Sequence, residues 1–184
     1  MPVWVWVVIG IVALVVLYGV VTYNRLVRTR NRINAAWSQI DVQLRRRYDL
    51  IPNLVETVKG YAAHERGVFE RVTEARSAGI AAKTVPEQAQ AENQLTQALR
   101  QLFAVVENYP QLKANENFLA LQEELTGTEG RIAFARQFYN EQVLTYNNLV
   151  QQAPSNLVAN LASFTTREYF EIEEAAAGPV RVQF

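Results

Sequence analysis

The stretch that decides the fold is Val3–Tyr23, which reads VWVWVVIGIVALVVLYGVVTY and carries no charged side chain. As a helix, a run of this length spans roughly 30 Å, the thickness of the hydrocarbon core of a bilayer. Trp4 near one end and Tyr23 at the other are residue types that favour the two membrane interfaces. We therefore expect residues 1–24 to form a transmembrane anchor.

A cleaved signal peptide is the alternative interpretation of this stretch. Such a peptide needs a basic start, a shorter apolar run and a cleavage site of small residues. Here the start is Met1-Pro2-Val3, without Lys or Arg, and the apolar run continues into Tyr23-Asn24-Arg25. We expect the segment to be retained.

Four arginines follow the anchor within eight positions: Arg25, Arg28, Arg30 and Arg32. The positive-inside rule then places the N-terminus outside and the rest of the chain in the cytoplasm, as a single-pass protein of the inner membrane. The same side chains suit anionic lipid headgroups, each contributing on the order of 1 kcal/mol near the surface. No aromatic residues interleave with them for base stacking, so we expect no nucleic-acid partner.

Composition limits the remaining possibilities. About 160 residues follow the anchor, enough for one domain with a sizeable core. The chain has no Cys, which excludes disulfides and thiolate metal ligands within it. Net charge is zero, but Arg25 to Arg76 carries +5 and Thr84 to Phe184 carries −6. This asymmetry fits complementary contacts within or between subunits, and it fits equally well a set of solvated helix faces.

Apolar periodicity predicts helix through most of the chain after the anchor. In the first predicted helix, Ile33, Ile40 and Leu44 lie on one stripe. Because a proline inside a helix costs roughly 3 kcal/mol, we expect a tight corner near Tyr48-Asp49, with Asp49 as N-cap and Pro52 in the next first turn. The alternative is one long helix, kinked at Pro52.

Three further helices are predicted after that corner. The second runs from about Leu50 to Ala78, and the third opens with Pro86 in its first turn and stops at Pro110. A loop from Gln111 to Ala114 precedes the fourth helix, which Asn115 can cap and Pro154 ends. The fourth carries an apolar seam that alternates three and four positions, typical of coiled-coil packing, at Phe118, Leu121, Leu125, Thr128, Ile132, Ala135, Tyr139, Gln142, Tyr146 and Leu149.

The predicted fold class is therefore all-α: an N-terminal transmembrane helix, then an up-and-down antiparallel four-helix bundle over residues 25–153. Residues 154–184 form a tail, in which Ser155 can cap a short amphipathic helix. Phe170 and Ile172 then alternate with glutamates, and apolar residues alternate again after Gly178-Pro179, which indicates extended structure. The tail can pack on its own bundle, pair with another subunit or stay disordered.

The sequence contains no recognisable set of catalytic or metal-ligating residues. A di-iron bundle needs Glu-x-x-His on two helices, but His64 is the only histidine and position 61 is Tyr. His64-Glu65 also lacks the second histidine of a zinc protease motif. Asp41 and Arg45 have the spacing of a helical salt bridge. We expect no enzyme activity, no cofactor and no metal.

Four segments carry a resemblance to a known family. They are RNRINAAWSQIDVQLRRRYDLIPNLVETVKGYAAHE (Arg30–Glu65), YPQLKAN (Tyr109–Asn115), GTEGRIA (Gly127–Ala133) and REYF (Arg167–Phe170). The chain resembles LemA family proteins over essentially its whole length. The resemblance implies a bacterial single-pass membrane protein with a cytoplasmic helical bundle, and it supplies no catalytic residues.

The segments shared with the family coincide with predicted corners and the tail, which are better placed for interaction than for packing alone. The interaction candidates are Asp49, Pro52, Arg167, Tyr169 and Phe170. We expect a non-enzymatic membrane scaffold or adaptor that self-associates through its bundle and tail, with other membrane proteins as further partners. The alternative function is lipid-surface binding or membrane shaping, through the four arginines and the short helix from Ser155 to Ser163.

Overall fold

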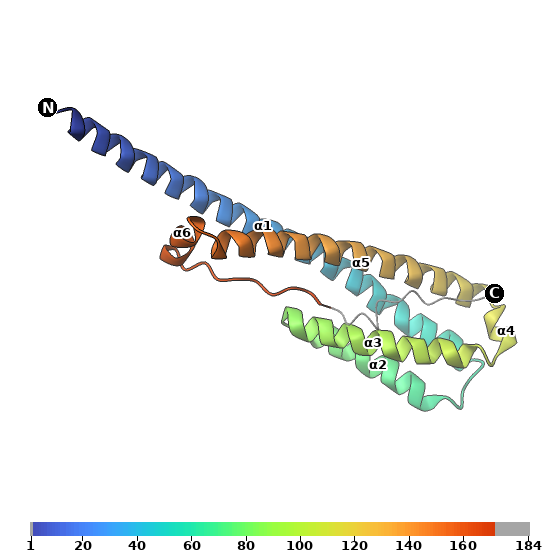
Figure 1. Cartoon of the computed structure of the whole chain (residues 1–184). Coiled ribbons are helices and arrows are strands. Elements are labelled where there is room, and N and C mark those ends of the chain that lie inside the picture. The colour runs from blue at the N-terminus through green and yellow to red at the C-terminus, as the bar shows by residue number, and fades with distance from the viewer. Residues whose placement is uncertain (1, 172–184) are drawn as a thin grey trace. The chain divides into compact units, whose positions relative to one another are not determined.

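The computed structural model describes residues 2–171, and this part of the chain is helical with short connections and contains no strand (Figure 1). The all-α class and the apolar N-terminal helix are thus confirmed for these residues. The helices are α1 (Val3–Lys59), α2 (Arg66–Ala81), α3 (Val85–Val106), α4 (Pro110–Lys113), α5 (Glu116–Gln151) and α6 (Ser155–Leu161).

The chain divides into two compact units, and α1 and α5 contribute to both. Among the described residues, the first unit comprises residues 2–38 and 138–168, and the second comprises residues 39–137 and 169–171. The boundaries predicted at residues 24 and 153 separate an anchor, a bundle and a tail, which need not coincide with compact units. They stay a prediction.

The predicted corner at Tyr48-Asp49 is wrong, because α1 continues through Pro52 as far as Lys59. The buried stripe continues on both sides of Pro52, through Leu44, Ile51 and Val58. Burying this continuous stripe favours one helix over two. Pro52 itself is exposed, and Asp49 lies inside the helix and caps nothing.

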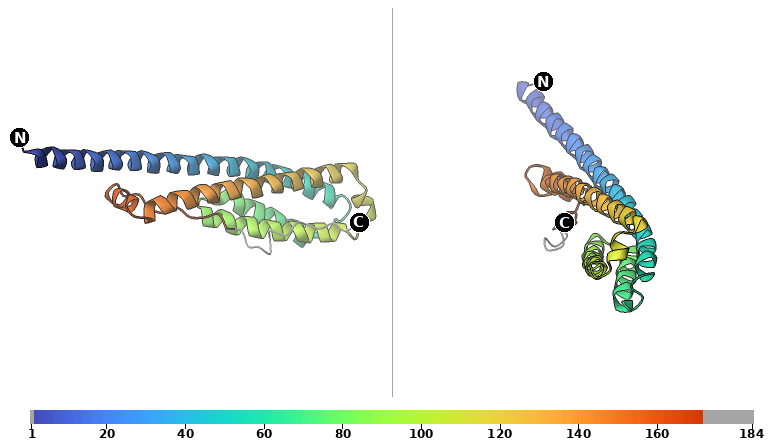
Figure 2. Two further views of the ribbon diagram at one scale, coloured as in Figure 1. Left: turned by 45° about the horizontal axis from the view of Figure 1, so that its top comes forward. Right: turned by 90° about the vertical axis from the view of Figure 1, so that its right-hand side faces the viewer.

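The turn that ends α1 lies at residues 60–65, about twelve residues later than the predicted corner. It leads into α2, which lies beside α3 in both views of Figure 2. The Thr84 hydroxyl caps α3 by accepting from the Glu87 N–H at 3.3 Å, and Pro86 lies in its first turn, as predicted. The predicted end of this helix was too late: α3 ends at Val106, and Pro110 begins α4.

The cap predicted for the last long helix is confirmed, because the Asn115 side-chain oxygen accepts from the Phe118 N–H at 3.0 Å. Most of the predicted seam of α5 is buried, from Phe118 through Tyr146. Ser155 is the first residue of α6 and not its N-cap. After α6 the chain runs without helix to Glu171, and the apolar alternation predicted at Ile172 and after Gly178 lies outside the described residues.

Candidate functional site

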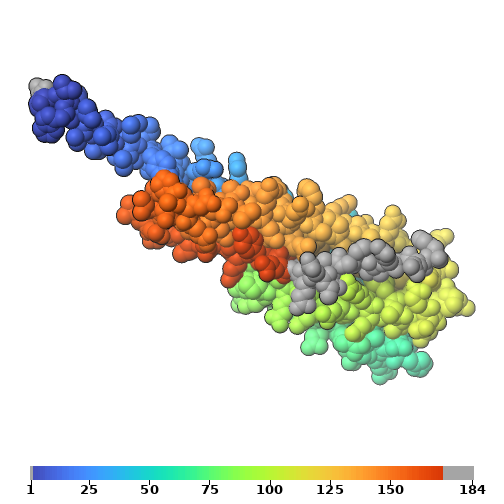
Figure 3. Space-filling view, viewed as in Figure 1, coloured from blue at the N-terminus to red at the C-terminus, as the bar shows by residue number. Residues whose placement is uncertain are grey.

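The N-terminal part of α1 is long and apolar enough to cross a membrane, with a mean hydropathy of 2.7 over its best window. Only 6% of that window is buried, and the blue side chains of this segment stand uncovered in Figure 3. Beyond it, Arg25, Arg28 and Arg32 are exposed, whereas Arg30 is half-buried. Their predicted role at the membrane surface stays a prediction.

Arg30 is half-buried because it packs on the segment that follows α6. Its guanidinium carbon lies 5.4 Å from the centre of the Phe164 ring, a cation–π distance. The Tyr23 ring meets the same phenylalanine edge-on at 5.7 Å between centres. Phe164 therefore joins the chain after α6 to the part of α1 where the apolar run ends.

An amide clamp holds the next residues of the tail against α5. The Asn147 side chain donates to the Arg167 carbonyl at 2.9 Å and accepts from the Arg167 N–H at 2.8 Å. The Tyr139 hydroxyl donates to the Glu168 carbonyl at 3.0 Å. Burial raises the pKa of Tyr139, so this hydroxyl stays protonated and able to donate.

The predicted interaction residues of the tail thus have different environments. The clamp uses the Arg167 backbone and leaves its side chain exposed. Tyr169 is 36% exposed, whereas Phe170 is fully buried and offers no free surface. The interaction roles proposed for them stay predictions.

The second unit contains a buried polar network that the sequence reading missed. It consists of Arg47 and Tyr48 from α1, Gln88, Glu92 and Thr96 from α3, and Glu129 from α5. The Arg47 guanidinium donates to Glu92 at 2.8 Å, to Glu129 at 3.0 Å and to Thr96 at 3.1 Å. The Arg47 and Glu92 side chains are only 4% and 1% exposed. This ion pair fixes which faces of α1 and α3 can meet, since any other register leaves a buried charge unpaired.

Tyr48 completes the network from the adjacent position. Its hydroxyl hydrogen-bonds Glu92 and accepts from the Gln88 amide at 2.7 Å. Burial, and next the Glu92 charge, raise the pKa of Tyr48 far above its usual value. The ring packs so closely on α2 that a Cβ at Gly79 would overlap it. Gly79 is therefore required for the contact between α1 and α2.

Pro52 is accommodated beside this network. A proline has no N–H, so the carbonyl four residues earlier, that of Tyr48, loses its helical donor. The Arg76 Nε on α2 supplies the missing hydrogen bond at 2.7 Å. The predicted interaction candidates Asp49 and Pro52 are thus exposed positions on a continuous helix, and no corner forms there.

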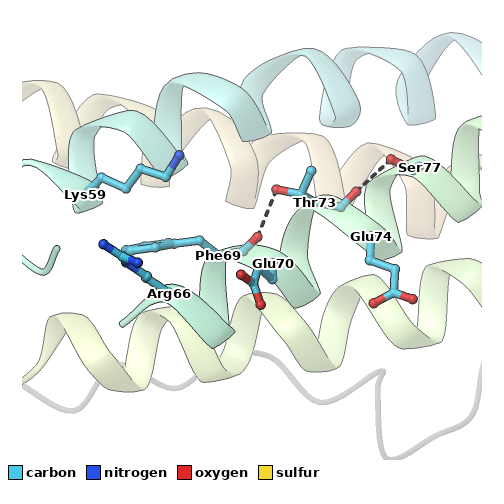
Figure 4. A pocket seen from close by; sticks show the side chains of 7 residues that line it. All are labelled: Lys59, Arg66, Phe69, Glu70, Thr73, Glu74 and Ser77. Atoms are coloured by element: carbon cyan, nitrogen blue, oxygen red, sulfur yellow. Dashed lines mark hydrogen bonds between the residues drawn. The ribbon is translucent and has the colours of Figure 1, made fainter. Parts of the chain in front are cut away.

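An open hollow of about 520 Å³ lies between the end of α1 and α2 (Figure 4). The Lys59 ammonium lies 5.9 Å from the centre of the Phe69 ring at one end, and Glu74 lines the other. Its hydroxyls bond backbone within α2, Thr73 to the Phe69 carbonyl and Ser77 to the Thr73 carbonyl. These side chains do not converge on a common point that a ligand would occupy.

Within residues 2–171, no three His, Cys, Asp or Glu side chains gather to hold a metal ion. His64 lies exposed in the turn between α1 and α2, not on a helix surface. The predicted salt bridge between Asp41 and Arg45 is confirmed at 2.9 Å.

One signal in the sequence points to the buried network. Arg47 occupies the stripe position between Leu44 and Ile51, and Glu92 occupies the apolar stripe of α3 that continues with Leu95. Opposite charges at core positions of two helices indicate a buried pair. The corner predicted at Tyr48-Asp49 instead placed Arg47 at the end of a helix.

Comparison with known proteins gives a consistent set of relatives. The model of the LemA family matches residues 36–184. The chain is 28% identical to magnetosome protein MamQ 2 of Paramagnetospirillum magneticum, over 86% of this chain and 68% of that protein. It is 26% identical to magnetosome protein MamQ of Magnetospirillum gryphiswaldense over the same shares. It is also 26% identical to protein LemA of Metamycoplasma hominis, over 82% of this chain and 69% of that protein.

Proposed function

The chain belongs to the LemA family, and we propose that it acts as a membrane-anchored, non-enzymatic scaffold that self-associates through its helical part. The names of its relatives, magnetosome protein MamQ and protein LemA, denote no reaction, which supports a non-enzymatic role. The four long helical segments of the second unit form an up-and-down bundle in this proposal. Other membrane proteins are its further partners.

The anchor is the apolar part of α1. Its length and hydropathy support insertion, and Arg25, Arg28 and Arg32 just beyond it support an N-terminus outside and a body on the cytoplasmic side of the inner membrane. Helix α1 continues past these arginines to Lys59, so the anchor and the residues that follow it belong to one helix.

The observation that carries self-association is the outward face of α5. Phe134 is 74% exposed there, on the same helix face as Gly127 and Gly130. A Cβ added at either glycine would meet nothing within 4 Å, so packing within the chain does not require glycine at these positions. Each nevertheless weakens the helix by about 1 kcal/mol relative to Ala. Close approach of a second copy of α5, with Phe134 buried between the copies, accounts for both features.

Sedimentation of the purified chain in detergent tests this proposal. We expect the wild type to exceed the mass of one chain plus micelle. Phe134→Ser removes a side chain whose burial contributes about 1.5–3 kcal/mol, so it should weaken association at least about tenfold. Gly130→Leu should block the close approach and do the same.

Gly67→Leu is the matched control, since Gly67 is an exposed helical glycine with ordinary surroundings on α2. It should leave the assembly unchanged. A wild type that is monomeric at every concentration would rule self-association out. Equal dissociation by Gly67→Leu and Gly130→Leu would rule out the α5 face.

A further inference from the structure

Helix α6 lies beside the end of the apolar part of α1. Both belong to the first unit, and Phe164 connects them through its contacts with Tyr23 and Arg30. In Figure 1 α6 lies at the end of α5 that points toward the N-terminal part of α1. Thr22, next to Tyr23, and Leu26, about one turn further along α1, are buried, in contrast to the exposed residues before them.

The position of Phe164 is fixed by how α6 ends. Its N–H donates to the Ala159 carbonyl at 2.9 Å, and the Ser163 N–H donates to the Asn160 carbonyl at 3.2 Å. Ser163 has φ 57°, so these bonds form a Schellman motif with serine in the left-handed position. The motif turns the chain back and holds α6 in one orientation relative to Phe164.

In that orientation α6 places its large apolar side chains outward. Leu157 and Leu161 lie four residues apart on one face and are 69% and 90% exposed. Ser155 and Ala159, the small residues of the opposite face, are buried. A helix packed on its own protein in water would show the reverse arrangement.

The sequence on both sides of α6 also lacks charged residues. Residues 142–166, which include the end of α5 and all of α6, contain no Asp, Glu, Lys or Arg. Residues 1–24 contain none either. The contacts of Phe164 bring these two charge-free segments together in one unit. Charged groups avoid the hydrocarbon of a membrane, and their joint absence here fits a shared lipid environment.

We propose that α6 is an interfacial helix that inserts Leu157 and Leu161 into the boundary between lipid headgroups and acyl chains. This rests on the proposed anchor, because an inserted α1 brings Tyr23 to the interface and α6 with it. The ligand is the lipid surface itself. Exposed Arg25, Arg28 and Arg32 lie within three turns of Tyr23 on α1, where anionic headgroups attract them. In this proposal the first unit contacts the bilayer at two places, through the anchor and through α6.

Lipid quenching of a fluorescent label tests this directly, and the absence of native Cys makes single-site labelling possible. The full chain carries one cysteine labelled with a polarity-sensitive fluorophore and is reconstituted into vesicles of phosphatidylcholine and phosphatidylglycerol. Some of the lipids carry a nitroxide on an upper acyl carbon. The sites are Leu161→Cys on α6, Val20→Cys in the anchor and Ala78→Cys on the exposed face of α2.

We expect the label at 161 to be quenched at least about half as strongly as the label at 20, and the label at 78 to be unaffected. Quenching at 20 without quenching at 161 overturns the proposal and leaves the anchor intact. A blue-shifted label at 161 that is not quenched would mean that protein, such as a second copy, covers α6, and this also overturns it. Quenching at neither 20 nor 161 would overturn both the anchor and the interfacial helix.

Discussion

Arg47 brings a permanent positive charge into the interior of the second unit. Its side chain is buried, and so is that of Glu92, to which it donates a hydrogen bond. The Arg47 Nε has no hydrogen-bond partner, so the ion pair is not fully satisfied. A buried pair of this kind contributes more to specifying one arrangement than to stabilising it.

Removing one partner should therefore be much worse than removing both. We expect Arg47→Met to lower the free energy of unfolding by about 3–5 kcal/mol, since Glu92 is then buried without a counter-charge. Adding Glu92→Leu should recover a large part of that loss. Urea unfolding of the detergent-solubilised chain, followed by circular dichroism, measures both.

Arg45→Met is the control for this comparison. Arg45 makes an exposed ion pair with Asp41, which is worth at most about 1 kcal/mol. If Arg47→Met lowers the free energy of unfolding no more than Arg45→Met does, the buried network does not contribute to stability as expected here.

The sequence predicted contacts between residues close in the chain better than contacts between residues far apart in it. The Thr84 and Asn115 caps and the Asp41–Arg45 bridge depend on neighbours three or four positions away, which the sequence displays directly. The partners of Arg47 lie 45 to 82 positions away. Pairing them requires knowing which helix faces meet, and spacing along one helix does not determine that.

At the scale of elements, α1 is where a local rule gave the wrong result. The cost of Pro52 predicted a break, but the buried stripe on both sides of it and the hydrogen bond from Arg76 to the Tyr48 carbonyl offset that cost. The donor that replaces the missing N–H belongs to Arg76 on α2, so the sequence around Pro52 does not reveal it. The periodic seam of α5 was predictable because burial of its apolar face depends only on local spacing.

Hydrogen bonds from side chains of α5, and not backbone pairing with another segment, hold the tail segment after α6 in place. Asn147→Ala removes both hydrogen bonds to Arg167, worth about 0.5–1.5 kcal/mol each. We expect the tail to open about ten times more often and trypsin to cleave after Arg167 about ten times faster. Mass spectrometry of timed digests measures this site separately from others.

Asn148→Ala is the control, at the next position of α5. It should leave cleavage after Arg167 at the wild-type rate. If Asn147→Ala cleaves no faster than Asn148→Ala, contacts other than the amide clamp hold the tail in place.

At the scale of the whole molecule, the location of charge matters more than its sum. Net charge is zero, yet residues 1–24 and 142–166 have no charged side chain and four arginines follow the first of these segments directly. The anchor was predictable because one uninterrupted apolar run carries the signal. A short amphipathic helix after Ser155 was predicted too, but which of its faces is buried depends on where Phe164 docks, and the sequence does not show that.

The proposed orientation predicts a labelling pattern in intact cells. We expect a membrane-impermeant maleimide to label Pro2→Cys before permeabilisation and Ala78→Cys only after it, because the basic side of the anchor stays inside. Both positions are exposed, and no native cysteine interferes. The opposite pattern would reverse the topology. The size of the labelled band decides whether the leading segment is retained: label from Pro2→Cys must run with the full 20.9 kDa chain, whereas a cleaved segment would take the label with it and leave the body unmarked.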